Sequence, residues 1–183
     1  MIIVVSVSVG VTFAAWSKQV TGRQTNVMVI GDINIRLNDV YTPQNNMEGG
    51  IDHAVDKVVS VTNTGNKPCY VRVLVRREWQ DNTDPDFIIP LYNTTYWIKA
   101  TGYSDPDGYY QDCYYYKGSG TGILAADSTT EPLFSKFYLK EGETSYKGKK
   151  GSIIVKAQAV QSDNIALTDL TVWPNDLNFQ EAS

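Results

Sequence analysis

The side chains able to carry chemistry in this chain are few, and only one of them is an imidazole. His53 is the sole histidine among 183 residues and lies in the stretch Ile51-Asp52-His53-Ala54. Zinc sites and acid–base pairs draw mainly on histidine. The sequence contains no H-E-x-x-H and no G-x-S-x-G motif. A lone imidazole beside a loop is typical of a surface residue, so we predict no catalytic role for His53.

Aspartates gather in two places, and such oxygen-rich loops are where Ca²⁺ binds. The first group is Asp81, Asp84 and Asp86, and the second is Asp105, Asp107 and Asp112. Neither spacing fits the calcium loop of about twelve residues with glycine at its sixth position and glutamate at its last. We interpret both groups as turn-forming, solvated aspartates, with an irregular calcium site as the alternative. The sequence therefore predicts no metal ligand and no cofactor.

Cys69 and Cys113 are the only two cysteines, and both fall in expected strands. In an exported protein such a pair can close a disulfide. The alternative is two buried thiols that act as small apolar side chains. The choice depends on whether the two strands are adjacent, which one sequence does not settle.

Phosphate chemistry and nucleic-acid binding are both disfavoured. The glycines of residues 118–122 follow an expected strand, but no helix pattern opens behind them, and a phosphate cradle needs that helix N-terminus. The chain has 16 Lys and Arg against 20 Asp and Glu, a net charge of -4. No basic surplus exists to hold a phosphate backbone, so we expect no nucleic-acid partner.

The first sixteen residues carry no charge and end on small side chains at Ala14 and Ala15. The run is shorter than the ~20 residues of a membrane-spanning helix, which is typical of a secretory signal peptide. A basic start is missing from it, and a buried first strand is the alternative. We predict cleavage between Ala14 and Ala15. The expected organisation is a signal peptide at 1–14, an N-terminal segment at 15–30 and one domain at 31–183.

The remaining chain alternates between apolar and polar residues, as half-buried strands do. The clearest case is residues 69–76, whose valines we expect to face the core while the arginines face water. Residues 40–54 contain Pro, Asn and Gly, residues 80–90 contain Pro and Asn, and both stretches are expected to be loops. Only Asp163 to Leu170 has a helical pattern. Short strands without crossover helices predict an all-β antiparallel sandwich with one short C-terminal helix.

Several stretches, in order along the chain, resemble the TasA/camelysin family of exported Gram-positive proteins. They are residues 10–16 (GVTFAAW), 29–37 (VIGDINIRL), 59–65 (VSVTNTG), 70–73 (YVRV), 108–110 with 114–116 (GYY and YYY), 132–134 (PLF) and 157–161 (AQAVQ). The sequence departs from the family at 54–57, where a "pGd" is usual, and at Cys69, where a small residue is common.

The resemblance implies a jelly-roll-like β-sandwich, secretion to the cell surface or matrix, and a role in extracellular fibres of a biofilm. It also implies a dedicated signal peptidase as a partner during export, transient membrane contact through the leader, and self-association or binding to related matrix proteins. Camelysin itself is described as a surface metallopeptidase, which is the alternative function. Tyr and Trp side chains suggest a carbohydrate-binding sandwich as a further alternative.

Assembly by strand addition is the physical mechanism that we expect. The segment 15–30 contains strand-compatible residues such as Trp16, Val20 and Val27 but lacks strict alternation. Such a segment is expected to order by pairing with an open sheet edge of a neighbouring subunit, where main-chain hydrogen bonds supply most of the affinity.

Overall fold

The computed structural model describes residues 27–30, 33–44, 47–79, 85–105, 108–142 and 149–162, and these form an all-β sandwich, as the sequence predicts. The signal peptide 1–14, the Ala14–Ala15 junction, residues 15–26 and the expected helix at 163–170 lie outside the described residues. No described helix is long and apolar enough to cross a membrane.

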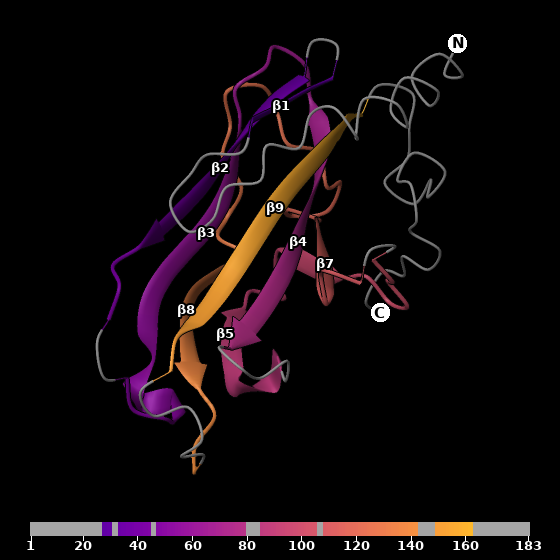
Figure 1. Ribbon diagram of the computed structural model, residues 1–183. Coiled ribbons are helices and arrows are strands. Elements are labelled where there is room, and N and C mark those ends of the chain that lie inside the picture. The colour runs from indigo at the N-terminus through magenta and orange to yellow at the C-terminus, as the bar shows by residue number, and fades with distance from the viewer. Residues whose placement is uncertain are drawn as a thin grey trace.

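Two antiparallel sheets pack face to face (Figure 1). The first has the order β1-β2-β3-β8-β5, with β1 Val27–Ile30, β2 Ile33–Tyr41, β3 Val55–Asn63, β8 Phe134–Leu139 and β5 Ile88–Tyr92. The second has the order β6-β7-β4-β9, with β6 Trp97–Lys99, β7 Asp112–Tyr116, β4 Cys69–Trp79 and β9 Gly151–Gln161. Two short 3₁₀ helices, η1 Ile51–His53 and η2 Pro85–Phe87, lie in the connections. The sandwich is established, while its jelly-roll order stays a prediction.

The first sheet has the alternation of a half-solvated sheet. On β2, Ile33, Ile35 and Leu37 are buried against the second sheet. The opposite face carries polar residues, and the Asn38 amide donates hydrogen bonds to Ser60 Oγ at 3.3 Å and Thr62 Oγ1 at 2.9 Å. One face in the core and one in water is the usual condition of an antiparallel sheet.

The second sheet is buried on both faces, which corrects the expectation of a wet arginine face on residues 69–76. Val71, Val73 and Val75 do face the core between the sheets. On the other side, however, Tyr70 and Leu74 belong to a second apolar cluster, and Arg72 is only 3% exposed. Strands buried on both faces read as near-continuous apolar runs, and β4 is buried without a break from Cys69 to Val75.

The expected loop at 80–90 is also corrected at its end, because Ile88 to Tyr92 form strand β5. Pro90 suggested a loop, since proline cannot donate to a strand ladder. Strand β5 lies at the edge of the first sheet and pairs only with β8 in the described structure. A proline, which has no N–H group to donate, is tolerated in such an edge strand. Of the expected loop at 40–54, the described residues 42–44 and 47–50 lie outside the strands and helices, whereas β2 extends to Tyr41 and η1 occupies residues 51–53.

Candidate functional site

Within the described residues, the strand edges of the two sheets are incompletely paired where β2 and β9 meet. Strand β1 pairs only with Ile33 to Arg36 of β2, whereas β3 pairs with β2 as far as Tyr41. From Leu37 to Tyr41, β2 therefore has a strand on one side only, within the described residues. Strand β9 pairs with β4 and ends the second sheet. We call these facing edges, Leu37–Tyr41 of β2 and Gly151–Gln161 of β9, the open corner.

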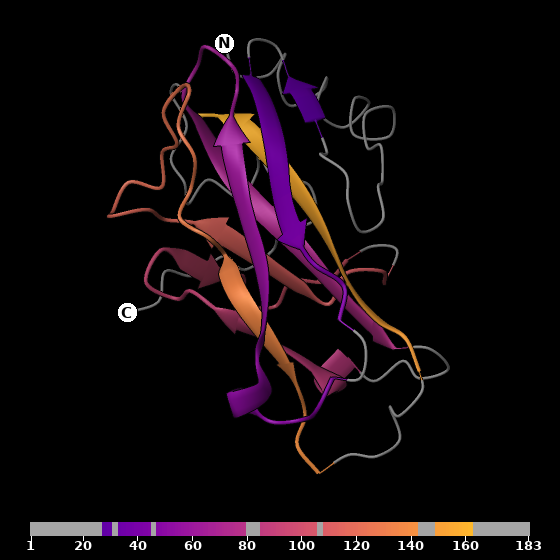
Figure 2. The ribbon, with the colours of Figure 1, turned by 90° about the vertical axis from the view of Figure 1, so that its left-hand side faces the viewer.

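The views agree that β2 and β9 run beside each other along one side of the sandwich (Figure 2). An incompletely paired edge presents backbone N–H and C=O groups that need partners. In a strand, these groups alternate between the two sides, so about half of the residues at 37–41 point toward the open corner. The chemistry this arrangement offers is main-chain hydrogen bonding to an added strand.

A buried ion pair stands behind the open edge of β2. Asp39 continues the inward alternation of β2, and its carboxylate accepts a hydrogen bond from the Lys57 ammonium on β3. The two side chains are 6% and 4% exposed. The Lys57 nitrogen also lies 5.4 Å from the Tyr41 ring centroid. Inward-pointing charges beside an edge disfavour indiscriminate strand pairing, because an added strand must accommodate them.

A second charged cluster, centred on the buried carboxylate of Asp112, joins the two sheets through β4, β5, β6 and β7. The Asp112 carboxylate accepts from Lys99 Nζ at 2.7 Å and from Arg77 Nη2 at 3.0 Å. Tyr92 Oη on the first sheet donates to the same carboxylate at 3.3 Å. The Tyr92 ring stacks on Tyr114, with centroids 4.2 Å apart. This cluster fixes the position of edge strand β5 against the second sheet.

The tyrosines of this cluster are held in their neutral form. Burial raises the pKa of the Tyr92 phenol well above its ordinary range, and the Asp112 carboxylate raises it further. Burial likewise raises the pKa of Tyr114. A phenol that stays protonated donates its hydrogen bond at every physiological pH, so its role here is that of a fixed donor.

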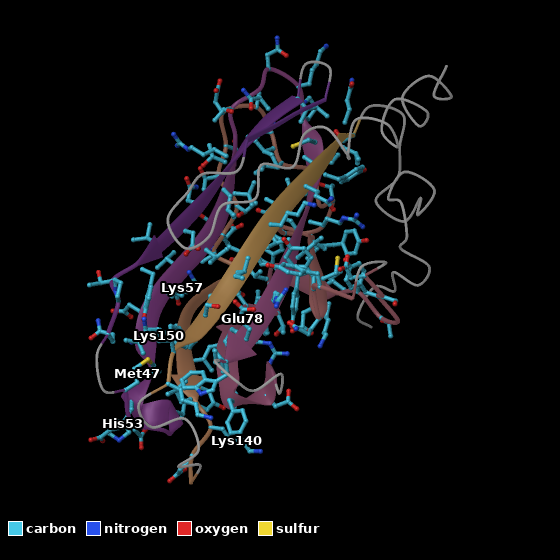
Figure 3. All side chains as sticks on the ribbon, in the orientation of Figure 1. Met47, His53, Lys57, Glu78, Lys140 and Lys150 are labelled. Atoms are coloured by element: carbon cyan, nitrogen blue, oxygen red, sulfur yellow. The ribbon has the colours of Figure 1, made fainter. Side chains whose placement is uncertain are left out.

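His53 lies at the lower end of the molecule, in η1 (Figure 3). Its Nε2 is 3.4 Å from a carboxylate oxygen of Glu48, and the two side chains are 51% and 76% exposed. Among the described residues, no group of three or more His, Cys, Asp or Glu side chains converges to hold a metal ion.

The structure separates the aspartates that the sequence groups together. Asp105 is turn-forming, as predicted, because its carboxylate accepts from the backbone N–H groups of Tyr109 at 2.7 Å and Tyr110 at 3.1 Å. Asp86 is 76% exposed. Asp112 was expected to be solvated, and this is wrong, since it is buried in the charged cluster described above. The others, Asp81, Asp84 and Asp107, lie outside the described residues.

Both cysteines are buried and neither is in a disulfide, which agrees with the alternative of two buried thiols. Cys69 lies in the core between the sheets, while Cys113 lies on the opposite face of the same sheet. Cys113 is the register partner of Leu74, five positions along β4 from Cys69. Five positions span about 17 Å of strand, far beyond the reach of a disulfide.

Sequence reasoning missed the ion pair Asp39–Lys57, although the pattern contains its signal. Asp39 is in phase with Ile35 and Leu37, and Lys57 is in phase with Val59 and Val61, so both occupy core-facing positions. A charged residue that alternates in step with the core-facing apolar residues of a strand is buried with them, and a buried charge needs a partner of opposite charge.

Comparison of the chain with protein-family models, with curated proteins and with solved structures finds no match in any of the three. The fold and the residues of the open corner are therefore the basis for any functional conclusion.

Proposed function

We propose that this protein is an exported structural subunit that assembles by strand addition, with the open corner as the accepting site. The observation that carries the proposal is that β2 from Leu37 to Tyr41 pairs on one side only among the described residues, and that this stretch lies beside β9. An added strand satisfies backbone groups on the accepting edge and on itself, so this edge supplies a partner-binding site without any reactive side chain.

The donor in this proposal is residues 15–26 of a neighbouring copy, which are the part of the N-terminal segment 15–30 that precedes β1. Residues 27–30 of the segment originally expected form β1 and pair with β2 of their own chain. The β1–β2 register pairs Val27 with Arg36. Continued by four residues, this register sets Arg23 opposite Val40. Residues 22–26 of the same chain could fill the edge in that register, whereas the same residues of a neighbour would link two subunits.

A pair of introduced cysteines distinguishes these two arrangements. Residues opposite each other in an antiparallel pair lie about 4.5–5.5 Å apart at Cα, within the range of a disulfide. The Val40 side chain is 66% exposed, so Val40→Cys alters no core contact. Oxidation of an Arg23→Cys/Val40→Cys chain is expected to give a ladder of covalent oligomers.

The control pair is Arg23→Cys/Leu91→Cys, because Leu91 lies on β5, at the other edge of the first sheet. We expect little cross-linking from it. A monomeric disulfide in the Arg23→Cys/Val40→Cys chain would show that the edge is filled within one chain. Deletion of residues 15–26 should then lower the order of assembly in light scattering and electron microscopy. Equal assembly by the deleted chain contradicts strand donation by this segment.

Export belongs to the same proposal. The uncharged run ending at Ala14 and Ala15 supports removal of a signal peptide by a dedicated peptidase, secretion, and a place in an extracellular matrix. N-terminal sequencing of secreted material should give Ala15 as the first residue. Retention of residues 1–14 on exported protein would contradict the processing step.

A further inference from the structure

The outer face of the second sheet is apolar, and its side chains are almost completely buried. The cluster consists of Tyr70, Leu74, Ile98, Ala100, Cys113, Tyr115 and Val160, each at most 7% exposed. Arg72 lies among them and donates from Nε to Gln158 Oε1 at 2.6 Å. A sandwich of two sheets alone would leave such a face in water, as the first sheet leaves its own.

One end of this face is covered by the connection between β6 and β7. Tyr103 and Tyr110 of that connection pack on the cluster, and burial raises the pKa of the Tyr103 phenol. The Arg76 guanidinium lies 3.7 Å from the ring centroid of Tyr109. This connection accounts for cover near Cys113, on the β7 side of the face.

The other end of the face lies where the described chain leaves β9. Tyr70 and Val160 are register partners there, and Ser162 N donates to Pro68 O at 3.2 Å. Twenty-one residues follow, 163–183, and they begin beside this end of the face. Their apolar members are Ile165, Ala166, Leu167, Leu170, Val172, Trp173, Leu177, Phe179 and Ala182.

Charge also favours residues 163–183 as the segment that covers this face. Residues 163–183 contain four acidic residues, Asp163, Asp169, Asp176 and Glu181, and no Lys or Arg. The register of β4 and β9 places three basic residues, Arg72, Arg76 and Lys156, on the outer face. Glu78 is the one acidic residue that the same register places there. The N-terminal residues 15–26, by contrast, carry Lys18 and Arg23 and no acid, and they lead into the first sheet.

The segment is also long enough to cover the face. The eleven residues of β9 span about 36 Å. Twenty-one residues reach about 70 Å when extended. Eight of them in a helix, as the sequence pattern predicts for 163–170, still leave about 55 Å in total.

We propose that residues 163–183 dock along the outer face of β4 and β9 in their own chain and form a third layer over the second sheet. The apolar residues of the segment cover Tyr70 and Val160, and its carboxylates lie near the basic side chains of the face. This inference is independent of strand addition, because it concerns a sheet face and not a sheet edge.

Photo-crosslinking of the full mature chain, 15–183, identifies what covers the face. A photo-crosslinking phenylalanine analogue replaces Tyr70, which keeps the aromatic shape of the side chain. We expect an intramolecular product, joined to a peptide from residues 163–183 in mass spectrometry. A crosslinked dimer would assign the cover to a second copy, and a crosslink to residues 15–26 would assign it to the N-terminal segment. Either result overturns the proposal.

Thiol labelling in the full chain supplies a second measurement. Val160→Cys should be protected, and the added substitutions Leu167→Asp and Leu170→Asp should raise its alkylation rate by about 100-fold. Val71→Cys, on the core face of β4, should stay protected with and without them, and Val40→Cys should react rapidly in both. An unchanged Val160→Cys rate would contradict docking. If Val71→Cys also becomes reactive, Leu167→Asp and Leu170→Asp have unfolded the chain. The photo-crosslink from position 70 then decides whether residues 163–183 cover the face.

Discussion

The indole of Trp79 lies over the backbone of Gly151, its register partner at the end of the β4–β9 pair. A Cβ atom at position 151 would overlap the six-membered ring of Trp79 and lie 3.0 Å from Cδ1 of Ile88. Glycine is therefore required here by close approach. An aromatic side chain that covers a strand glycine also helps to fix the register of the pair.

Gly151→Ala should lower the free energy of unfolding by about 1–3 kcal/mol, because the added methyl group has no space. Urea unfolding measures the change. Combined with Trp79→Ala, which removes the ring, the same substitution should cost much less. The control is Gly142→Ala, whose Cβ meets nothing within 4 Å but whose φ is +80°, so its cost is one of backbone strain. Trp79→Ala should not relieve that cost. Additive effects of Gly151→Ala and Trp79→Ala would contradict the overlap.

Asp112→Asn should destabilise the fold by about 3 kcal/mol, because it removes the buried carboxylate that pairs with the largely buried Arg77 guanidinium and leaves it with the exposed carboxylate of Asp86, 3.8 Å away. Asp56→Asn is the matched control, since the Asp56 side chain is 82% exposed and lies 3.4 Å from Lys136 at the surface. We expect no measurable change from it. Equal effects of the two substitutions in thermal unfolding would show that burial of the Asp112 cluster is unimportant.

Cys69 should make the fold sensitive to alkaline pH. Burial raises the pKa of its thiol from 9.0 to about 12. The folded state thus favours the protonated thiol, and this contribution is complete below pH 9 and is lost as pH rises toward 12. Between pH 8 and pH 10 the loss should be about 1.4 kcal/mol. Cys69→Ala should abolish this part of the pH dependence, while Val71→Ala, on the same face of β4, should retain it. Parallel pH profiles for all three proteins would contradict the assignment.

His53→Ala should leave stability and any measurable activity unchanged. The side chain is half exposed, and its partner Glu48 is more exposed still, so the pair is screened by water. Casein hydrolysis and zinc content of the purified protein measure the alternative function directly. A proteolytic activity that His53→Ala abolishes would favour the metallopeptidase over the structural subunit.

Alternation along the chain was sufficient to predict the sandwich and most of its strands, because a sheet with one wet face imposes a period of two. The strand predicted at 69–76 is present and continues to Trp79, but the prediction for the environment of its second face is wrong. Alternation between Val71, Arg72 and Val73 predicts a wet arginine, whereas Arg72 is buried. The cover of that face comes from elsewhere in the chain, and local sequence carries no record of it.

Strand β5 was missed for a related reason. A proline such as Pro90 breaks a central strand but is tolerated in an edge strand. Whether a strand is central or at an edge depends on pairing between distant parts of the chain, which the local sequence does not reveal. The open corner also depends on distant pairing, since it consists of the part of β2 beyond the described β1 pairing and of β9, which lies beside both strands. Asp39 and Lys57 were predictable as core-facing charges, but their contact required the register of β2 on β3.

The position of β9 has a consequence for the time course of folding. Strand β4 obtains its longest pairing, from Cys69–Gln161 to Trp79–Gly151, with a strand that is at least 72 positions later in the sequence. A chain that crosses a membrane N-terminus first cannot complete its second sheet until residue 161 has emerged. Sandwiches with such distant contacts fold in about milliseconds to seconds. If the chain is exported as proposed above, the late arrival of β9 delays completion of the second sheet until nearly all of the chain has been delivered.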